Sequence, residues 1–597
     1  MCGIWHMYEM SRNETPLEVV RWLTGRATGA WPAILGSLSL RRSPCIRENC
    51  PACQSGEQHP SYVLYGRLKG RRFSVYVPEE LVPEVRRCLD NGRAVQELLY
   101  EAAPRYVKAL KRERAMAGRR ATSCDVSRAA NPQISFADWE LMRQGLVLEP
   151  LLRSISDFLD DHDELVRQIG GDLRRGLKNP DTGRSGLTPQ EVLRSLILMR
   201  VKNWDYRELR ERIADGYTLR QFTGFHCRPV PKHQAFHRAF VRLTPATLRV
   251  VNELVVEAAV DLGLEDGTKL RVDTTVVQTD IHHPTDSTLL WDAVRVLTRL
   301  LVRLGGLLGR RIKGFHNRTR AARRRMQAIQ RMSAAQRHRR QTGKYRELIA
   351  IAEEVVACAG SALRDPRKAR GKDLFCDLAV EGLRQEIDHY CGLAGRVIDQ
   401  ARRRVIEGEQ VPNAEKIFSI FESHTDLIKR GKVQTPVEFG HKVLLAESAR
   451  GLITQYEVLK GNPSDEHHVE SSLERHKDVF GRAPDLYGAD RGFFSERNLT
   501  LCQDAGVNVA CIPQSGGKKA PQREAYEKTP AFKQGPRFRA GIEGRISVLF
   551  RGRGMKRCLA EGIERFDLLV GAAVLANNLM RIASLLMKPS ARQRRAA

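Results

Sequence analysis

One strand-like stretch of this chain carries an acid where an apolar residue is expected. Residues 270–277 read LRVDTTVV, so Asp273 lies in the middle of a segment rich in β-branched residues. Burying an unpaired carboxylate in such a strand is costly because the charge loses its hydration. A bound divalent cation removes that cost. The stretch therefore predicts a buried strand that supplies a metal ligand.

Two more acids complete a candidate metal site. Asp490 ends the strand-like segment 485–490, and site residues commonly follow the carboxyl ends of strands in open α/β sheets. Glu543 lies in a segment with helical apolar spacing that is expected to begin near Arg539, one turn before it. Two hard cations about 3.5–4 Å apart can clamp the attacking and leaving oxygens of a phosphoryl displacement. We therefore predict that Asp273, Asp490 and Glu543 bind two hard divalent cations and are catalytic.

Each acid taken singly has a simpler explanation. Asp273 could form a salt bridge near Arg271, and Asp490 could be a turn residue before Gly492. Glu543 could pair with Arg539 on a helix surface, an interaction worth little. The catalytic interpretation is favoured because the three acids occur together on the expected elements.

The charge of the chain points to a polyanionic partner. Lys and Arg number 99 against 70 Asp and Glu, a formal net charge of +29. Membrane surfaces are anionic too, but the longest apolar stretch, residues 568–587, is interrupted by Asn577, Asn578 and Arg581. No secretory signal is visible, and thirteen scattered cysteines suit reduced thiols. We expect a soluble intracellular protein that binds nucleic acid and no membrane.

Four stretches of the chain differ in pattern. Residues 1–130 are predicted to form a small α+β N-terminal module with a cysteine-containing hairpin and a charged helix, and residues 136–265 a helical, helix-turn-helix-like DNA-binding domain. Residues 266–287 with 411–590 are predicted to form an α/β catalytic domain with a mixed sheet flanked by helices. Residues 288–410 form a basic helical insertion that interrupts this domain.

Arginines cluster in the predicted helices. A dense basic run with few acids repels itself unless an anion neutralises it, so phosphate contact is our interpretation, although a solvated face is the common alternative. The arginines expected to contact DNA are Arg207 and Arg210 in the helical domain, Arg323, Arg324 and Arg325 in the insertion, and Arg539, Arg545, Arg551 and Arg553 around the third acid.

Two other groups could bind a metal. Cys45, Cys50 and Cys53, with His59 six residues on, have a spacing that suits one tetrahedral Zn²⁺, and reduced surface thiols are the alternative. Two polar groups are interpreted as contacts to DNA rather than as metal ligands. The loop after the first strand contains Asp280, His282, His283 and Asp286, and a later group consists of His424, Asp426 and His441.

The order of predicted elements is close to that of an RNase H-like fold, with a helical block between the first and second strands. The segments RVDTTVVQTDIHHPTDSTLL, EFGHKVLL, GADRGF, EGRISVLFRGRG and ANNLMRIA resemble DDE transposases of bacterial insertion sequences, the ISNCY-like branch in particular. Residues 145–587 carry the resemblance, which implies a triad of Asp273, Asp490 and Glu543. Related enzymes often have Tyr and Lys near the third acid, where this chain has Pro536 and Phe550. Residues 1–130 resemble a small module of unknown function in proteins of mobile elements.

The sequence and this resemblance together imply a cytoplasmic DNA transposase that uses Mg²⁺ or Mn²⁺ to cut element ends in double-stranded DNA and join them to a target. A homodimer or higher multimer is expected because two DNA ends must be held together. Two alternatives remain open: a transposase-derived DNA-binding or regulatory protein without nuclease activity, and an RNase H-like nuclease that cuts without joining.

Overall fold

The structure is a computed structural model. It describes residues 15–43, 50–56, 59–68, 71–120, 147–178, 186–226, 228–364, 374–429, 436–514 and 516–587. Two compact units divide the chain, Met1–Gly145 and Leu146–Ala597. The predicted zinc ligand Cys45 lies outside the described residues.

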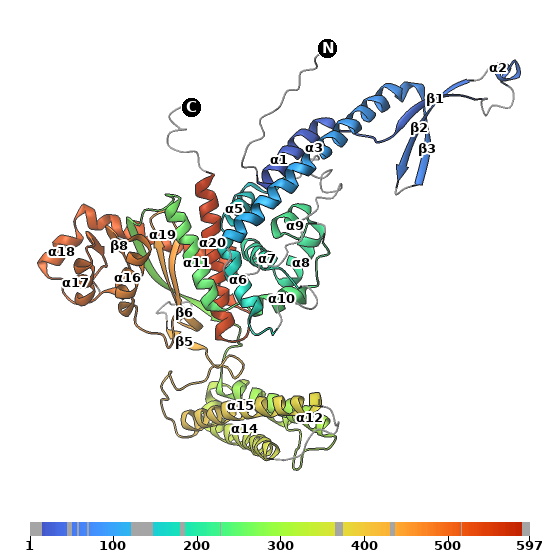
Figure 1. The fold of residues 1–597 in the computed structure, drawn as a ribbon. Helices are drawn as coiled ribbons and strands as arrows, with labels where there is room; N and C mark the ends of the chain where they lie inside the picture. The colour runs from blue at the N-terminus through green and yellow to red at the C-terminus, as the bar shows by residue number, and fades with distance from the viewer. Residues whose placement is uncertain are drawn as a thin grey trace. The chain divides into compact units, whose positions relative to one another are not determined.

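The first unit combines a small antiparallel sheet with helices (Figure 1). The strand order is β1-β2-β3, and Leu64, Val77 and Val82 form the centre of its core. Gly66 faces Phe73 across the β2–β3 hairpin, and the Phe73 ring lies over it, so a Cβ at this position would require the ring to move. The elements are α1 Pro16–Ala27, β1 Ser37–Ser43, α2 Pro51–Gln54, β2 His59–Leu68, β3 Arg71–Val77 and α3 Val82–Arg120.

The second unit begins with seven helices around one apolar core. Thr188 caps α7 as its sequence predicts: its side chain accepts from the Glu191 backbone N–H, and the Glu191 carboxylate accepts from that of Thr188. Asp205 caps α8 through two backbone N–H groups. The helices are α5 Pro150–Asp161, α6 Asp163–Arg174, α7 Pro189–Lys202, α8 Tyr206–Asp215, α9 Tyr217–Thr223, α10 His233–Val241 and α11 Pro245–Asp261.

A seven-stranded mixed sheet follows. β4 lies at its centre, antiparallel to β6 on one side and parallel to β8 and β10 on the other. β5 and β7 pair with the far edge of β6, and β9 is parallel to β8. The strands are β4 Lys269–Thr279, β5 Asp426–Lys429, β6 Val437–Ser448, β7 Ile453–Val458, β8 Leu486–Gly488, β9 Val509–Cys511 and β10 Arg557–Cys558.

Helices cover both faces of this sheet (Figure 1). Alternating side chains of β4 and β6 pack against α16, Val469–Phe480, and α17, Glu496–Asp504, on one face. The remaining apolar side chains of these strands pack on the other face against α19, Pro530–Gly552, and α20, Ile563–Leu586. The result is the mixed α/β architecture that the strand and helix patterns predict.

Helix α20 is the one helix among the described residues that is long and apolar enough to cross a membrane, and 72% of its most apolar window is buried. One side of it joins the core of the seven helices and another joins the sheet core, which explains its apolar character all round. Asn578, which interrupts the apolar run, exchanges two 2.9 Å hydrogen bonds with the backbone of Ile453.

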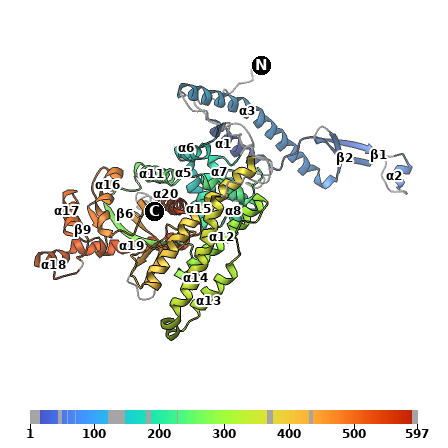
Figure 2. The same ribbon diagram turned by 90° about the horizontal axis from the view of Figure 1, so that it is seen from below.

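The segment between β4 and β5 forms a helical bundle with an apolar core drawn from residues 289–420 (Figure 2). Its helices are α12 Asp286–Leu308, α13 Thr319–Gln330, α14 Ala334–Leu363 and α15 Leu374–Ala401.

Helix α19 begins at Pro530, nine residues before the predicted start near Arg539, and continues through Pro536. A proline inside a helix leaves the carbonyl four residues earlier without its usual donor. That carbonyl belongs to Phe532, and it accepts a hydrogen bond from the Cys511 thiol of β9. A tertiary partner thus replaces the missing backbone bond.

Candidate active site

Strand register brings Asp273 and Asp490 together. β8 runs parallel to β4, with Gly488 opposite Arg271. Asp490 lies two residues beyond Gly488, and Asp273 lies two residues beyond Arg271, so the two acids are at the same level of adjacent chains. Asp490 begins a short turn, and its Oδ1 accepts from the backbone N–H of Gly492 at 2.8 Å. The sheet therefore fixes both acids next to each other.

Arg539 connects the third acid to this pair. It lies one turn before Glu543 on α19, and its guanidinium donates to Glu543 Oε1 at 3.1 Å. The same guanidinium donates to Asp273 Oδ2 at 2.8 Å and lies 3.9 Å from Asp490 Oδ2. The structure thus brings together the three acids that the sequence singles out.

The three acids differ in their exposure. The Asp273 side chain is 10% exposed, that of Asp490 37% and that of Glu543 65%. Burial raises the pKa of Asp273 to about 6, and the negative charge of Asp490 also raises it, whereas the Arg539 cation lowers it. The site therefore contains one buried carboxylate whose ionised form is poorly solvated.

A buried ionic network holds α19 against the sheet. Glu447 of β6 is fully buried, and its two carboxylate oxygens bind different arginines: Arg271 of β4 at 2.8 Å and Arg545 of α19 at 2.9 Å. Arg271 also donates to the carbonyl of Phe538 on α19 at 2.7 Å. These bonds set the position of the helix that carries Arg539 and Glu543.

Two glycines of α19 allow this close approach. A Cβ at Gly541 would lie 2.0 Å from Nη1 of Arg271, and one at Gly535 would lie 2.0 Å from the Cys511 sulfur. Both distances are far below van der Waals contact, so a side chain at Gly541 would displace the Arg271 guanidinium from its bonds, and one at Gly535 would collide with the Cys511 side chain.

Asp465, which the sequence analysis does not single out, lies beside these acids. Its Oδ1 accepts from Thr274 Oγ1 at 2.9 Å and from Lys442 Nζ at 3.2 Å. A Cβ at Gly492 would lie 3.0 Å from Asp465 Oδ2 and 3.1 Å from Asp490 Oδ1, so both carboxylates lie against this glycine. The only sequence signal for Asp465 is its place shortly after β7, the second strand of the β6–β7 pair, and this signal is weak.

The other arginines expected around the third acid have different environments. Arg545 is bonded to Glu447 and to Asn577, and Arg553 donates to the carbonyl of Val201 at 2.6 Å. Arg551 is exposed at the end of α19. Of these three arginines, Arg551 is therefore the most accessible to DNA.

The polar loop after β4 has partners within the protein. Buried Asp286 accepts from Gln400 at 2.8 Å and from Arg404 at 2.7 Å, which ties α12 to the end of the bundle. His282 bonds to Asp292 at 2.7 Å. Asp280 lies 3.7 Å from an Arg557 nitrogen, and His283 packs edge-on against Phe439.

A second polar chain lies where the bundle returns to the sheet. The rings of His424 and His441 are stacked and joined by a 2.7 Å hydrogen bond between ring nitrogens. The outer nitrogen of His424 bonds to Glu422 at 2.7 Å, and that of His441 bonds to Asp426 at 3.2 Å. These contacts give both histidines structural partners.

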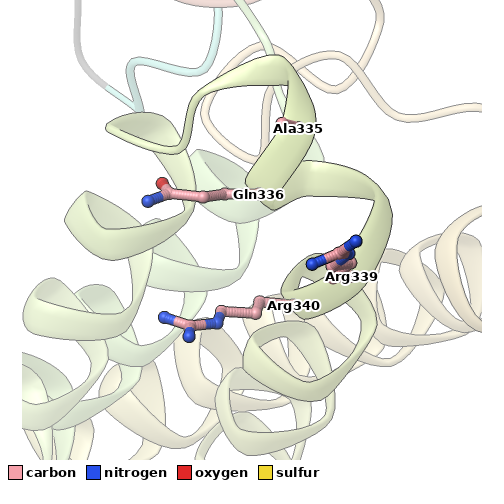
Figure 3. A pocket seen from close by; sticks show the side chains of 4 residues that line it. All are labelled: Ala335, Gln336, Arg339 and Arg340. Carbon is pink, nitrogen blue, oxygen red and sulfur yellow. The ribbon is translucent and has the colours of Figure 1, made fainter.

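The helical bundle presents an arginine-rich surface. Arg323 and Arg324 of α13 are exposed, whereas Arg325 pairs with Glu347. At the start of α14, Gln336 and Arg340 project from the same side of the helix, beside Arg339, and line a shallow open depression (Figure 3). On α8, Arg207 is exposed and Arg210 half-buried, with Glu208 and Glu211 as neighbours on the helix.

Three of the four predicted zinc ligands are close together. Each of Cys50, Cys53 and His59 offers one atom, and these atoms lie within 4.8 Å of one another. Cys50 Sγ is 3.1 Å from His59 Nε2. Thiolate sulfur and imidazole nitrogen are ligands that suit Zn²⁺. This cluster could hold a metal ion.

Comparison with known proteins gives one match. Residues 144–242 match the family model of a transposase domain (DUF772), a segment that includes α5 to α10. No curated protein and no solved structure matches the chain. The match supports a transposase family, with DNA as the partner. The acids on β4, after β8 and on α19 lie outside the matched segment.

Proposed function

We propose that this protein is a DDE-type DNA transposase that cleaves the ends of an insertion sequence and joins them to target DNA. The observation that carries the proposal is the meeting of Asp273, Asp490 and Glu543 around one arginine, in a chain with a matching transposase domain. The +29 charge agrees with a DNA substrate.

The strand order supports an RNase H-like catalytic domain. Five strands of the large sheet lie in the order β7-β6-β4-β8-β9. β4, β6 and β7, which come first along the chain, are antiparallel neighbours, and β8 and β9, which come last, run parallel to β4. The helical bundle α12 to α15 lies between the first and second of these strands in sequence. We assign the domain to residues 266–287 and 411–590, with 288–410 as the insertion.

The acids fit a site for hard cations. All the donors are carboxylate oxygens, the type that Mg²⁺ and Mn²⁺ prefer, and buried Asp273 is stabilised in its ionised form by a neighbouring cation. Asp273, Asp490 and Glu543 would hold the metal ions. When bound, such ions polarise a phosphodiester and activate the attacking oxygen.

The residues of the chain have separate parts in this reaction. The β4–β8 register keeps Asp273 and Asp490 side by side, and the Glu447 network keeps Glu543 opposite them. Arg539 provides a fork of N–H donors that suits a DNA phosphate. In hydrolysis, a water oxygen forms a bond to phosphorus as the 3′ oxygen leaves and takes a proton. In joining, the oxygen of that 3′ hydroxyl loses its proton and forms a bond to a phosphorus of the target, while the target strand's own 3′ oxygen leaves and takes a proton.

The helical parts would hold DNA outside the cleavage site. The domain at 136–265, which contains the transposase match, is proposed to bind the element ends through residues such as Arg207 and Arg210. The exposed arginines of α13 would bind the duplex through phosphates. Two ends must be held at once, so a dimer or higher multimer in the cytoplasm is the proposed active form.

The cysteine cluster is proposed to bind one zinc ion. Cys50 and Cys53 would supply two sulfurs and His59 one nitrogen. These residues lie in and after the connection between β1 and β2, so the ion would fasten the end of that hairpin.

The test uses labelled duplexes that carry the inverted repeats bracketing the gene, incubated with the full chain and Mg²⁺ or Mn²⁺. We expect cleavage and joining by the wild type and neither by Asp490→Asn, which keeps its DNA binding. Asp504→Asn, an exposed acid on α17, is the matched control and should retain both activities.

The other outcomes discriminate between the remaining functions. If the wild type binds these duplexes without cleaving them, the proposed enzymatic activity is overturned and a transposase-derived DNA-binding protein is favoured. Cleavage without joining would favour a nuclease. Cleavage that persists in Asp490→Asn would show that the assigned acids are wrong.

A further inference from the structure

A single side chain takes the place of a counter-ion in the acid cluster. The terminal nitrogens of Arg539 lie 2.8 Å from Asp273, 3.1 Å from Glu543 and 3.9 Å from Asp490. The guanidinium therefore contacts the same three carboxylates that are proposed to bind metal. One positive charge cannot occupy this position together with divalent cations without strong repulsion.

The binding of Arg539 to the acids is incomplete. Its Nε is buried and has no hydrogen-bond partner among the described residues. One guanidinium charge faces three carboxylates, so the cluster keeps a deficit of positive charge. The Asp490 oxygen at 3.9 Å is too far for a direct hydrogen bond. These features suit a temporary occupant better than a permanent structural bridge.

We propose that Arg539 is a positioning residue that keeps the three acids together until divalent cations replace it, and that it then turns to a phosphate of bound DNA. This inference rests on the proposed function, because it requires the acids to be metal ligands. It predicts competition: any metal ion that enters must displace the guanidinium from Asp273. It also predicts coupling, because a DNA phosphate that binds Arg539 makes the acids more available to metal.

The test measures Mn²⁺ binding to the full chain by electron paramagnetic resonance, without DNA and without turnover. Arg539→Gln removes the competing charge, and we expect Mn²⁺ to bind at least threefold more tightly than to the wild type. Arg537→Gln, an exposed arginine of the same helix, is the matched control and should bind like the wild type. A residue with a purely structural role would give weaker metal binding when removed.

A second measurement tests the coupling. Addition of a DNA duplex should tighten Mn²⁺ binding to the wild type, and this gain should be smaller in Arg539→Gln. If Arg539→Gln does not fold, Arg539→Lys serves instead, since it keeps the charge but cannot bridge three acids with a planar fork. Arg539→Lys should then bind Mn²⁺ more tightly than the wild type.

The two proposals fail in different ways. If Asp490→Asn binds Mn²⁺ as tightly as the wild type, the acids are not the metal ligands and the proposed function is overturned. If Asp490→Asn weakens Mn²⁺ binding but removal of Arg539 leaves it unchanged or weaker, only the role of Arg539 is overturned.

Discussion

Arg545 donates to Glu447 at 2.9 Å, and this bond fastens α19, the helix that carries Glu543, to β6, the neighbour of the strand that carries Asp273. The two residues are 98 positions apart in the sequence. Glu447 is fully buried, and its other oxygen binds Arg271 of β4, so one carboxylate sets the distance between α19 and the sheet.

Glu447→Gln should loosen this attachment. The substitution leaves two arginine charges without their counter-charge, and breaking a buried pair in this way costs about 3–5 kcal/mol. We expect faster hydrogen exchange of the α19 amides and a lower unfolding temperature. Glu524→Gln, from an exposed pair with Lys528, is the control and should change neither. Unchanged exchange in α19 would show that other contacts position the helix.

Asp273→Asn should stabilise the metal-free protein near neutral pH. The pKa of Asp273 is about 6 in the fold, above its ordinary value of 3.8 in the unfolded chain, so the fold binds this proton more tightly. The resulting stability is present below about pH 4 and is lost as pH rises through about 6. Ionised Asp273 then costs the fold up to about 3 kcal/mol.

Thermal unfolding in a chelator at pH 5, 6 and 7.5 checks this prediction. The advantage of Asp273→Asn over the wild type should grow with pH across this range, and Asp504→Asn should show no such trend. An advantage that is equal at all three values would mean that the Asp273 charge is well solvated.

The paired substitution Arg323→Gln and Arg324→Gln should weaken DNA binding without regard to sequence. Each exposed arginine that contacts a phosphate contributes about 0.9 to the slope of log affinity against log salt, so the slope should fall by about 2. Fluorescence anisotropy from 50 to 200 mM NaCl measures it. Arg325→Gln should have a smaller effect because Arg325 pairs with Glu347. An unchanged slope in the double variant would show that this surface does not contact DNA.

Local features of the sequence predict much of this fold. The capping box of Thr188 and Glu191 depends on residues three positions apart. The β6–β7 hairpin depends on a tight turn, which contains Gly451, and on the two strands beside it. Both features are therefore visible without tertiary information. The acids Asp273 and Asp490 were identifiable because a charge in or after an apolar strand requires a reason.

Partners from distant segments explain what the sequence could not predict. The start of α19 at Pro530 has a local signal, the Thr529 cap followed by a proline at the first helical position. Pro536 obscures that signal because a proline usually ends a helix. In the structure the Cys511 thiol, 21 residues away, binds the Phe532 carbonyl that Pro536 leaves without a donor. Arg545 and Arg553 look like DNA contacts in a basic segment, but Glu447 and the carbonyl of Val201 bind them. Asp465 joins the site through Thr274, 191 positions away. Composition and spacing do not reveal such pairs.

The final prediction concerns zinc. The full chain should carry one Zn²⁺, held by Cys50, Cys53 and His59, because their ligand atoms lie within 4.8 Å of one another. Ser43, the last residue of β1, pairs with His59, the first of β2, so the ion would close the connection between these strands. A zinc-sensitive dye should detect one equivalent in the wild type after mild unfolding, and none in Cys53→Ser.

Cys376→Ser, on α15 and outside the cluster, is the matched control and should keep its zinc. Cys45→Ser tests the predicted fourth ligand: loss of zinc would include Cys45 in the site, and retention would leave three protein ligands. Removal of the ion should make the β1–β2 connection more sensitive to limited proteolysis, because the proposed ion ties Cys50 and Cys53 to His59 at the start of β2. Zinc that remains in Cys53→Ser would mean that the metal is bound elsewhere, and a wild type without zinc would leave reduced thiols as the correct interpretation.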